Sequence, residues 1–324
     1  MPSEKAIVVS DLTKYYGALL AVDHISFNVE RGEIFGFLGP NGAGKTTTIR
    51  VLTGVTKPTS GVAMISGFDV MREPIKAKGL VGVAPEVSCL YDEMTAWDNI
   101  NFSAKLHGIP KGKRTALARE LLELFGLYER RNDHVNTFSG GMKKRLMIAT
   151  ALVHEPEILF LDEPTTGLDV QSSRQIRDLI KELNGKGTTV FLTTHYIEEA
   201  DQLCQRIAII DRGKVITVDT PEKLKTMVQV EHIIEVSFDH AEGIVNKLKG
   251  LNRVKDVITS GDKFRLYVED PSETLPFIFH FAEKNHLKVT SVSTLKPTLE
   301  DAFVKLTGLR PEVMTIEKEH AKSA

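Results

Sequence analysis

The chain has 324 residues, 42% hydrophobic and 26% charged, and it exceeds the roughly 250–300 residues at which one hydrophobic core stops growing, so we expect two folded domains. No run approaches the ~18–20 apolar residues of a membrane span, and the start, MPSEKAIVVS, lacks the basic cluster and apolar core of a signal peptide, so we expect a soluble, cytoplasmic chain. The net charge of −2 argues against a nucleic-acid partner, and two cysteines are too few for a disulfide framework or a cysteine metal site.

The first two thirds of the chain predict strands alternating with helices. Residues 6–38 favour strands, and the last of these, 34–38, is continuously apolar, as in a strand buried on both faces. From about 95 to 155 the pattern is mainly helical. Strand-like apolar runs then return, separated by helical segments, at 158–161, 188–193 and 206–210. This alternation indicates an α/β fold with a mostly parallel sheet.

The pattern changes near residue 220, where a second domain is expected. Its predicted elements follow the order strand, helix, strand, strand, helix, strand, and then a terminal helix, over 231–238, 241–249, 253–259, 263–268, 272–285, 287–293 and 298–307. That order is the βαββαβ arrangement of a small α+β, ferredoxin-like domain. We therefore assign 1–226 to a first domain and 230–308 to a second, with 309–324 as a mobile tail.

A glycine-rich segment directly follows the buried strand 34–38 and precedes a helical pattern. It fits GxxxxGK[ST] through Gly39, Pro40, Asn41, Gly42, Ala43, Gly44, Lys45 and Thr46. Glycines let backbone N–H groups approach phosphates, and the helix N-terminus adds partial positive charge. We expect Lys45 to reach the β- and γ-phosphates of a nucleoside triphosphate and the Thr46 hydroxyl to bind Mg²⁺.

Two acids end the apolar strand 158–161. A strand that carries acids at its carboxyl end delivers them to the ligand crevice of a parallel sheet. We expect Asp162 to hold Mg²⁺ and Glu163 to polarise the attacking water.

Four further segments, taken with the glycine-rich loop, resemble the ordered motifs of ABC ATPases over about residues 5–225. Thr137–Met142 (TFSGGM) is similar to the signature sequence, Glu163–Asp169 (EPTTGLD) to the D-loop region, Thr193–His195 to the switch histidine, and Tyr16 to the aromatic residue that stacks on adenine. The resemblance implies a P-loop NTPase fold of the ABC type. Such a fold has a parallel core sheet, an antiparallel β subdomain and a helical signature subdomain, here about 87–157.

The same resemblance implies the ligand and the role of each site residue. ATP and Mg²⁺ are the expected ligands. Tyr16 would contact adenine, with Tyr15 on the opposite face of the strand as a packing residue, and Thr47 would join residues 39–46 around the phosphates. His195 would sense the γ-phosphate. Ser139, Gly140, Gly141 and the D-loop residue Asp169 would act on ATP bound by a second subunit, either a second copy or a paralogue.

The sequence departs from the family pattern at two positions. Glu86 stands where the family usually has a glutamine that contacts Mg²⁺ and couples to the membrane partner, and Met142 replaces the last glutamine of the signature. As a hard oxygen ligand, Glu86 is expected to strengthen Mg²⁺ binding but to repel γ-phosphate. The basic run Lys143–Arg145 is expected to be a solvated face.

The segment Lys296–Phe303 (KPTLEDAF) looks like the ending of ATPase subunits of ABC-2 type exporters. We therefore predict an ATP-hydrolysing subunit that lies on the cytoplasmic face of a membrane and drives export through a separate permease, coupled through about Leu90–Ile100. An importer ATPase with a C-terminal regulatory domain is the alternative. A soluble ABC ATPase acting on ribosomes or DNA is disfavoured, because the chain has neither tandem nucleotide domains nor a long coiled-coil insertion. The second domain could serve dimer contact, regulation or permease docking.

Overall fold

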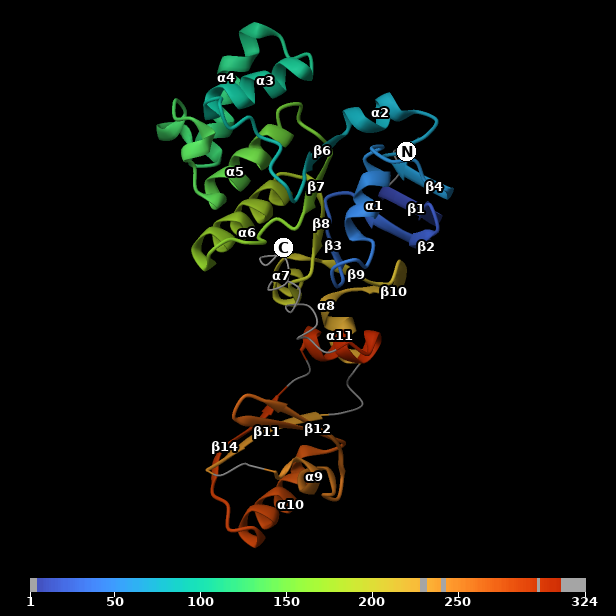
Figure 1. Ribbon diagram of the computed structural model, residues 1–324, viewed down its shortest axis with the longest axis vertical. Helices are drawn as coiled ribbons and strands as arrows, with labels where there is room; N and C mark the ends of the chain where they lie inside the picture. The colour runs from blue at the N-terminus through green and yellow to red at the C-terminus, as the bar shows by residue number, and fades with distance from the viewer. Residues whose placement is uncertain (1–4, 228–231, 240–242, 296–297, 310–324) are drawn as a thin grey trace. The chain divides into compact units, whose positions relative to one another are not determined.

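The computed structural model describes residues 5–227, 232–239, 243–295 and 298–309 (Figure 1). These residues form two compact units, one that extends to Pro221 and one that spans Glu222–Leu309. The proposed tail, 309–324, lies outside the described residues from position 310 onward, and so do Lys296 and Pro297.

The first unit is built on a six-stranded sheet in the order β10-β9-β3-β8-β7-β6. Five of its strands are parallel, and β10 pairs antiparallel with β9. The strands are β3 (Ile34–Leu38), β6 (Val81–Ala84), β7 (Ile158–Asp162), β8 (Thr189–Thr194), β9 (Arg206–Asp211) and β10 (Lys214–Asp219). Every residue of β3, β7 and β8 is buried, as expected for central strands covered on both faces. The predicted α/β class is confirmed.

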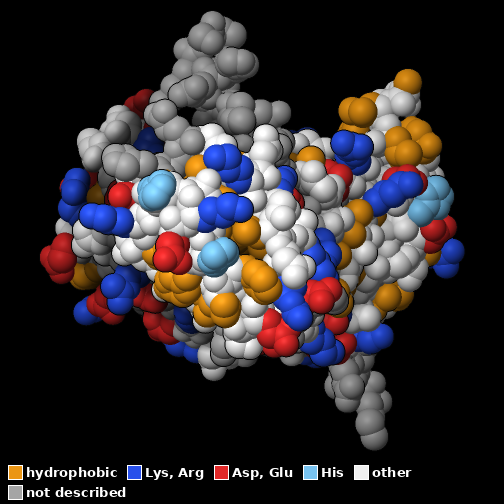
Figure 2. Space-filling model, turned by 90° about the horizontal axis from the view of Figure 1, so that it is seen from below, with side chains coloured by type: hydrophobic (Ala, Val, Ile, Leu, Met, Phe, Trp, Pro, Cys, Tyr) orange, Lys and Arg blue, Asp and Glu red, His pale blue; other side chains and the backbone are white. Residues whose placement is uncertain are grey.

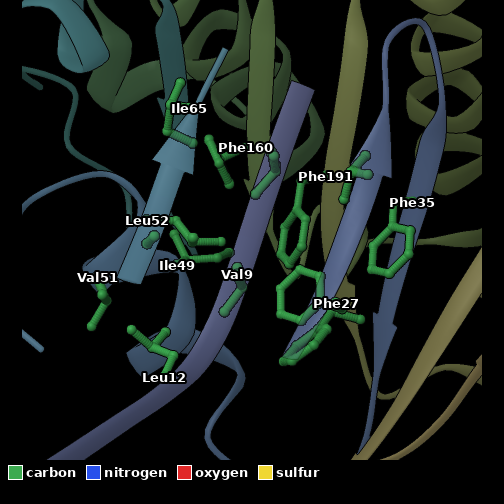
Figure 3. Close-up of a cluster of buried hydrophobic side chains, with 14 of the residues drawn as sticks. Val9, Leu12, Phe27, Phe35, Ile49, Val51, Leu52, Ile65, Phe160 and Phe191 are labelled. Carbon is green, nitrogen blue, oxygen red and sulfur yellow. The ribbon is translucent and has the colours of Figure 1, made fainter. Parts of the chain in front are cut away.

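An antiparallel sheet covers one side of this core, in the order β2-β1-β4-β5. Its strands are β1 (Lys5–Tyr16), β2 (Leu19–Glu30), β4 (Ser60–Ile65) and β5 (Phe68–Asp69). Aromatic rings join the two sheets: the ring of Phe27 on β2 lies 5.6 Å from that of Phe35 on β3 and 6.1 Å from that of Phe191 on β8 (Figure 3). Ile49 and Leu52 of α1 (Lys45–Leu52) belong to the same buried cluster. The packing of this core fixes the start of α1 against the sheet.

Helices other than α1 complete the first unit, and most of them lie beyond the opposite side of the six-stranded sheet, while α2 contacts β5 of the antiparallel sheet (Figure 1). They are α2 (Pro74–Gly79), α3 (Ala96–Leu106), α4 (Lys111–Leu124), α5 (Gly140–Ala151), α6 (Val170–Gly185) and α7 (Ile197–Leu203), with the short 3-10 helices η1 (Tyr128–Arg130) and η2 (Val135–Thr137). Between 87 and 157 the chain is mainly helical. Gly126 follows α4 with φ +63°, the left-handed conformation that ends many helices.

The second unit contains the predicted βαββαβ order. Its elements are α8 (Pro221–Met227), which begins at the boundary, then β11 (His232–Phe238), α9 (Val245–Lys249), β12 (Val254–Ser260), β13 (Lys263–Val268), α10 (Pro271–Lys284), β14 (Val289–Leu295) and α11 (Leu299–Thr307). The sheet order is β12-β13-β11-β14 and every pair is antiparallel. This is the strand order of a ferredoxin-like sheet. Ile234 and Val236 of β11 meet Ile278 of α10 in a separate hydrophobic core.

A capping box starts α11. The Thr298 hydroxyl accepts from the Asp301 N–H at 3.2 Å, and the Asp301 carboxylate accepts from the Thr298 N–H at 2.8 Å. The Tyr267 hydroxyl on β13 donates to the same carboxylate at 3.0 Å. Leu299 and Phe303 are fully buried. The segment Thr298–Phe303 therefore joins the terminal helix to the sheet.

Acidic and basic side chains are interspersed over the face shown in Figure 2, with groups of apolar side chains between them. The exposed apolar side chains of the second unit include Phe277 and Phe279 on α10.

Candidate functional site at the carboxyl end of the parallel sheet

The glycine-rich loop connects β3 to α1, as predicted. Gly44 has φ +104°, and a Cβ there would lie 2.5 Å from the Ala21 carbonyl oxygen. A Cβ at Gly39 would lie 2.2 Å from the Ile210 carbonyl oxygen. Only glycine fits at these two positions, so the loop backbone lies directly against β2 and β9.

Lys45, the first residue of α1, is a buried cation. Its Nζ donates to the carbonyl oxygens of Gly39 at 2.7 Å and Pro40 at 3.2 Å, and it lies 3.2 Å from Glu163 Oε1. The side chain is 6% exposed. An ammonium group held inside a loop of backbone N–H groups makes the loop a site for anionic oxygens.

Side-chain oxygens of the kind that bind metal ions lie close together on α1, β7 and β8. The Thr46 hydroxyl donates to Asp162 Oδ1 at 3.3 Å, and the Thr193 hydroxyl donates to the same oxygen at 2.5 Å. Carboxylate and hydroxyl oxygens are the ligands that Mg²⁺ prefers, and adjacent ligands at about 2.1 Å from the metal in an octahedron lie about 3 Å apart. The spacing of Thr46 and Asp162 therefore fits a magnesium site.

Glu163, directly after β7, has three partners: Lys45 on α1, Thr166 in the turn that follows β7 and His195 in the loop that follows β8. Its Oε2 accepts from His195 Nδ1 at 2.8 Å and from the Thr166 hydroxyl at 3.0 Å, while Lys45 approaches Oε1. Burial raises the pKa of Glu163, but the His195 hydrogen bond and the Lys45 charge outweigh it and hold the pKa below its usual value. The residue has φ +50°, a conformation that is uncommon for a side chain of this size. The carboxylate is therefore kept ionised in a fixed orientation.

A cavity of 610 Å³ opens beside these groups. The glycine-rich loop and α1 contribute Asn41, Gly42, Gly44, Lys45, Thr46 and Thr47 to its lining. Tyr16, which precedes the loop in the sequence, and Glu86, which follows it, also line the cavity. Glu163, directly after β7, lines it as well. Tyr15 is not among the lining residues, and it is 41% exposed, as is Tyr16.

Arg212 and Gly213 also line this cavity, and the sequence analysis did not single them out. They form the turn between β9 and β10, which is anchored because Gly213 donates its N–H to the Ala43 carbonyl at 3.0 Å and accepts from the Asp23 N–H at 2.8 Å. The sequence Asp211-Arg212-Gly213 between two apolar runs is a turn signal that could have located the turn. Nothing in the sequence places that turn beside the glycine-rich loop.

The signature segment lies at the N-terminus of α5. Ser139 is the N-cap and accepts from the Met142 N–H at 3.3 Å, and Gly140 is the first helical residue. A Cβ at Gly141 would lie 2.6 Å from the Ser172 hydroxyl oxygen, so α5 and α6 approach closely here. Asp169 is the N-cap of α6 and accepts from both the N–H and the hydroxyl of Ser172, at 2.8 and 2.7 Å. The two helix starts therefore form one surface.

The prediction of a solvated basic run at 143–145 is wrong for Lys144. This side chain is 8% exposed, and its Nζ donates to the carbonyl oxygens of Pro85 and Asp162, both at 3.3 Å. Lys143 fits the prediction better, since it is 27% exposed and pairs with Asp92 at 2.9 Å. Adjacent residues of a helix point in different directions, so one of three consecutive basic side chains can be buried while its neighbour is exposed. The sequence alone does not show which of the three is buried.

Within the described residues, no helix is both long enough and apolar enough to span a membrane.

Comparisons with known proteins identify the family of the chain. Residues 22–166 match the family described as ABC transporter. The linearmycin resistance ATP-binding protein LnrL of Bacillus subtilis is 38% identical over 92% of this chain and 97% of its own length. The Nod factor export ATP-binding protein I of Ralstonia nicotianae is 35% identical over 94% and 95%, respectively.

Among solved structures, the first unit resembles a dimeric ATP-binding cassette in a post-hydrolysis state bound to ADP and phosphate. The TM-score is 0.61 at 27% identity, and the match covers 66% of this chain and 98% of that one. The whole-length similarity to LnrL is sufficient to establish the family. The chain therefore belongs to the ABC transporter family, as one of its ATP-binding, ATP-hydrolysing subunits.

Proposed function

We propose that this chain binds ATP with Mg²⁺ in the 610 Å³ cavity, closes around two ATP molecules as a dimer, and drives export through a separate membrane permease. The observation that carries the proposal is the convergence of Lys45, Thr46, Asp162, Glu163 and His195 at the carboxyl end of the parallel sheet. Ligands of open α/β sheets bind at this edge.

Each residue has a role that its surroundings support. The loop 39–46 and Thr47 surround the phosphates, and Lys45 exchanges its loop carbonyl partners for phosphate oxygens. Tyr16, on the cavity wall, stacks on the adenine. Thr46 and Asp162 hold Mg²⁺ with Glu86 near them, and the ion neutralises phosphate charge.

Glu163 is proposed as the general base. It is ionised, buried and within reach of the cavity, so it can accept a proton from a water that attacks the γ-phosphate. His195 donates to the far oxygen of this carboxylate and thereby orients it. In this arrangement His195 responds to the γ-phosphate through Glu163 and Lys45.

The second half of the proposal concerns Ser139, Gly140 and Gly141. A helix N-terminus with a serine N-cap offers donors and partial positive charge to an anion. These residues are not among those that line the cavity of their own subunit. We assign them, with Asp169, to the ATP of a second subunit. The related cassette that binds ADP and phosphate is itself described as dimeric.

The export direction rests on relatives. LnrL is named for linearmycin resistance and the Ralstonia protein for Nod factor export, and the similarity to each extends through the second unit. We place the chain at the cytoplasmic face of a membrane, bound to a permease through Leu90–Ile100. Residues 1–226 would then be the nucleotide domain and 230–308 an accessory domain.

Complementation between two inactive variants tests the shared site. Lys45→Ala removes the phosphate cation and Ser139→Arg blocks the signature, so each variant alone should be inactive. In a mixed dimer, the intact loop of one subunit faces the intact signature of the other, and one of two sites is complete. Random mixing should restore roughly a quarter of the wild-type rate, because half of the dimers are mixed.

The control is a mixture of Lys45→Ala with Lys45→Ala/Ser139→Arg, which contains no complete site in any pairing. Restoration only in the first mixture supports action across subunits. Hydrolysis that stays absent in both mixtures, with both proteins folded and dimeric, contradicts the proposal.

A further inference from the structure

Lys144 is a buried cation that the proposed mechanism does not use. It lies in the second turn of α5, five residues after the N-cap Ser139. Its two acceptors are the backbone carbonyls of Pro85 and Asp162, both at 3.3 Å. These residues come from the ends of two neighbouring strands of the parallel sheet, β6 and β7.

The two carbonyls stand directly before the two acids of the site. Pro85 precedes Glu86, and Asp162 precedes Glu163. Both acids line the nucleotide cavity. Lys144 therefore connects the helix that carries Ser139 and Gly141 to the backbone that aims Glu86 and Glu163.

Burying the ammonium group of Lys144 costs free energy, because the charge is removed from water. Burial holds the pKa of Lys144 below its usual value, against the opposing charges of Asp162, Glu86 and Glu163. Two carbonyl acceptors and the nearby carboxylates offset this penalty. The position thus carries a charge and two hydrogen bonds that packing alone does not require.

We propose that Lys144 is a positioning residue, which ties the backbone before Glu86 and Glu163 to the signature helix so that both acids are aligned only when α5 is in place. The inference rests on the proposed function, since it takes Glu163 as the base and α5 as the helix that meets the second subunit. A displacement of α5 on dimer closure then reaches the hydrolytic acids of the same subunit through one side chain.

The positive charge of Lys144 also offsets the negative charge of Glu86, so that a carboxylate can stand at this position. Four acids act on this cation, namely Asp162, Glu86, Glu163 and Glu199. Without Lys144, the carboxylate of Glu86 adds to the repulsion of γ-phosphate. Replacing Glu86 by glutamine should therefore relieve part of the damage caused by loss of Lys144.

The test uses Lys144→Met, with Lys143→Met as a matched control on the same helix. Lys144→Met should lower kcat by about 10–100-fold, the usual effect of losing a group that orients a catalytic residue. Binding of a fluorescent ATP analogue without Mg²⁺ should change by less than about threefold, and the unfolding temperature should fall by no more than about 10 °C, because two hydrogen bonds to backbone carbonyls are lost. Lys143→Met should keep the wild-type kcat. The double variant Glu86→Gln/Lys144→Met should be faster than Lys144→Met.

Unchanged kcat in Lys144→Met overturns the proposal, and so does a loss that Glu86→Gln does not relieve. If Lys144→Met does not fold, Lys144→Gln takes its place, since it keeps a donor but loses the charge. Failure of both to fold assigns Lys144 a structural role and also overturns the proposal. Lys45→Ala is measured in parallel: hydrolysis that survives this change refutes the proposed function itself, whatever the result at Lys144.

Discussion

The two units place their polar groups differently. In the first, Lys45, Asp162, Glu163 and His195 are each at most 6% exposed at the end of the parallel sheet, and Glu163 pairs with both Lys45 and His195. In the second, ion pairs such as Lys249 with Asp256 lie near the surface, where each partner is about half exposed. Buried charges are costly and surface pairs contribute little to stability. The buried charges point to chemistry in the first unit, and each prediction below tests that inference.

The largest effect is expected at Glu163. Glu163→Gln removes the proton acceptor but keeps the shape of the side chain, so turnover should fall roughly 10²–10⁴-fold while ATP binding persists. Steady-state hydrolysis and titration with a fluorescent ATP analogue measure the two quantities. The variant should also accumulate as an ATP-bound dimer in gel filtration. Substantial turnover by this variant would remove Glu163 from the role of base.

In the second unit, Asp301→Ala should act on stability and not on hydrolysis. It removes one half of the capping box and the acceptor of Tyr267, so the free energy of unfolding should fall by about 1–2 kcal/mol. Urea unfolding followed by circular dichroism measures this change, with the exposed Lys305→Ala on the same helix as control. A loss of basal ATP hydrolysis at a temperature where the variant is folded would break the division between the two units.

Glu86→Gln should produce a change of a few-fold. The exchange removes a charge that attracts Mg²⁺ and repels γ-phosphate, and because Glu86 is exposed on the rim of the cavity, water weakens both effects. We expect a lower apparent affinity for Mg²⁺, with basal hydrolysis equal to wild type or faster. A Mg²⁺ titration of both proteins, with and without the permease, measures the difference. Curves that superimpose in both conditions would leave Glu86 without a role.

The smallest effect is expected at Arg212. Its side chain is 86% exposed, so its attraction for a bound nucleotide contributes at most about 1 kcal/mol, or roughly fivefold in affinity. Arg212→Ala should weaken ATP binding by up to this factor, and the difference should shrink as salt screens the charge. Equilibrium titrations at low and high salt provide the comparison. A difference that grows with salt would contradict an electrostatic contact.

The sequence predicted the helices and strands better than it predicted which side chains lie close together. The buried strands and the order of the second unit follow from local patterns of apolar residues, and Gly39–Thr46 carries its own spacing. The hydrogen bond between Glu163 and His195 joins residues 32 positions apart, and no local pattern encodes it. The burial of Lys144 depends on the reach of its aliphatic stem to two carbonyls from other strands. The two-residue strand β5 went unpredicted because a segment that short carries no periodic pattern, and β4 was also missed.

The capping box of α11 changes how the segment that suggested an exporter should be understood. Thr298 and Asp301 satisfy the first turn of the helix, while Leu299, Ala302 and Phe303 are buried. Every residue of TLEDAF except Glu300 thus either caps the helix or packs in the core. In this chain the segment closes the second unit, so folding alone accounts for its sequence and it does not by itself identify a cargo.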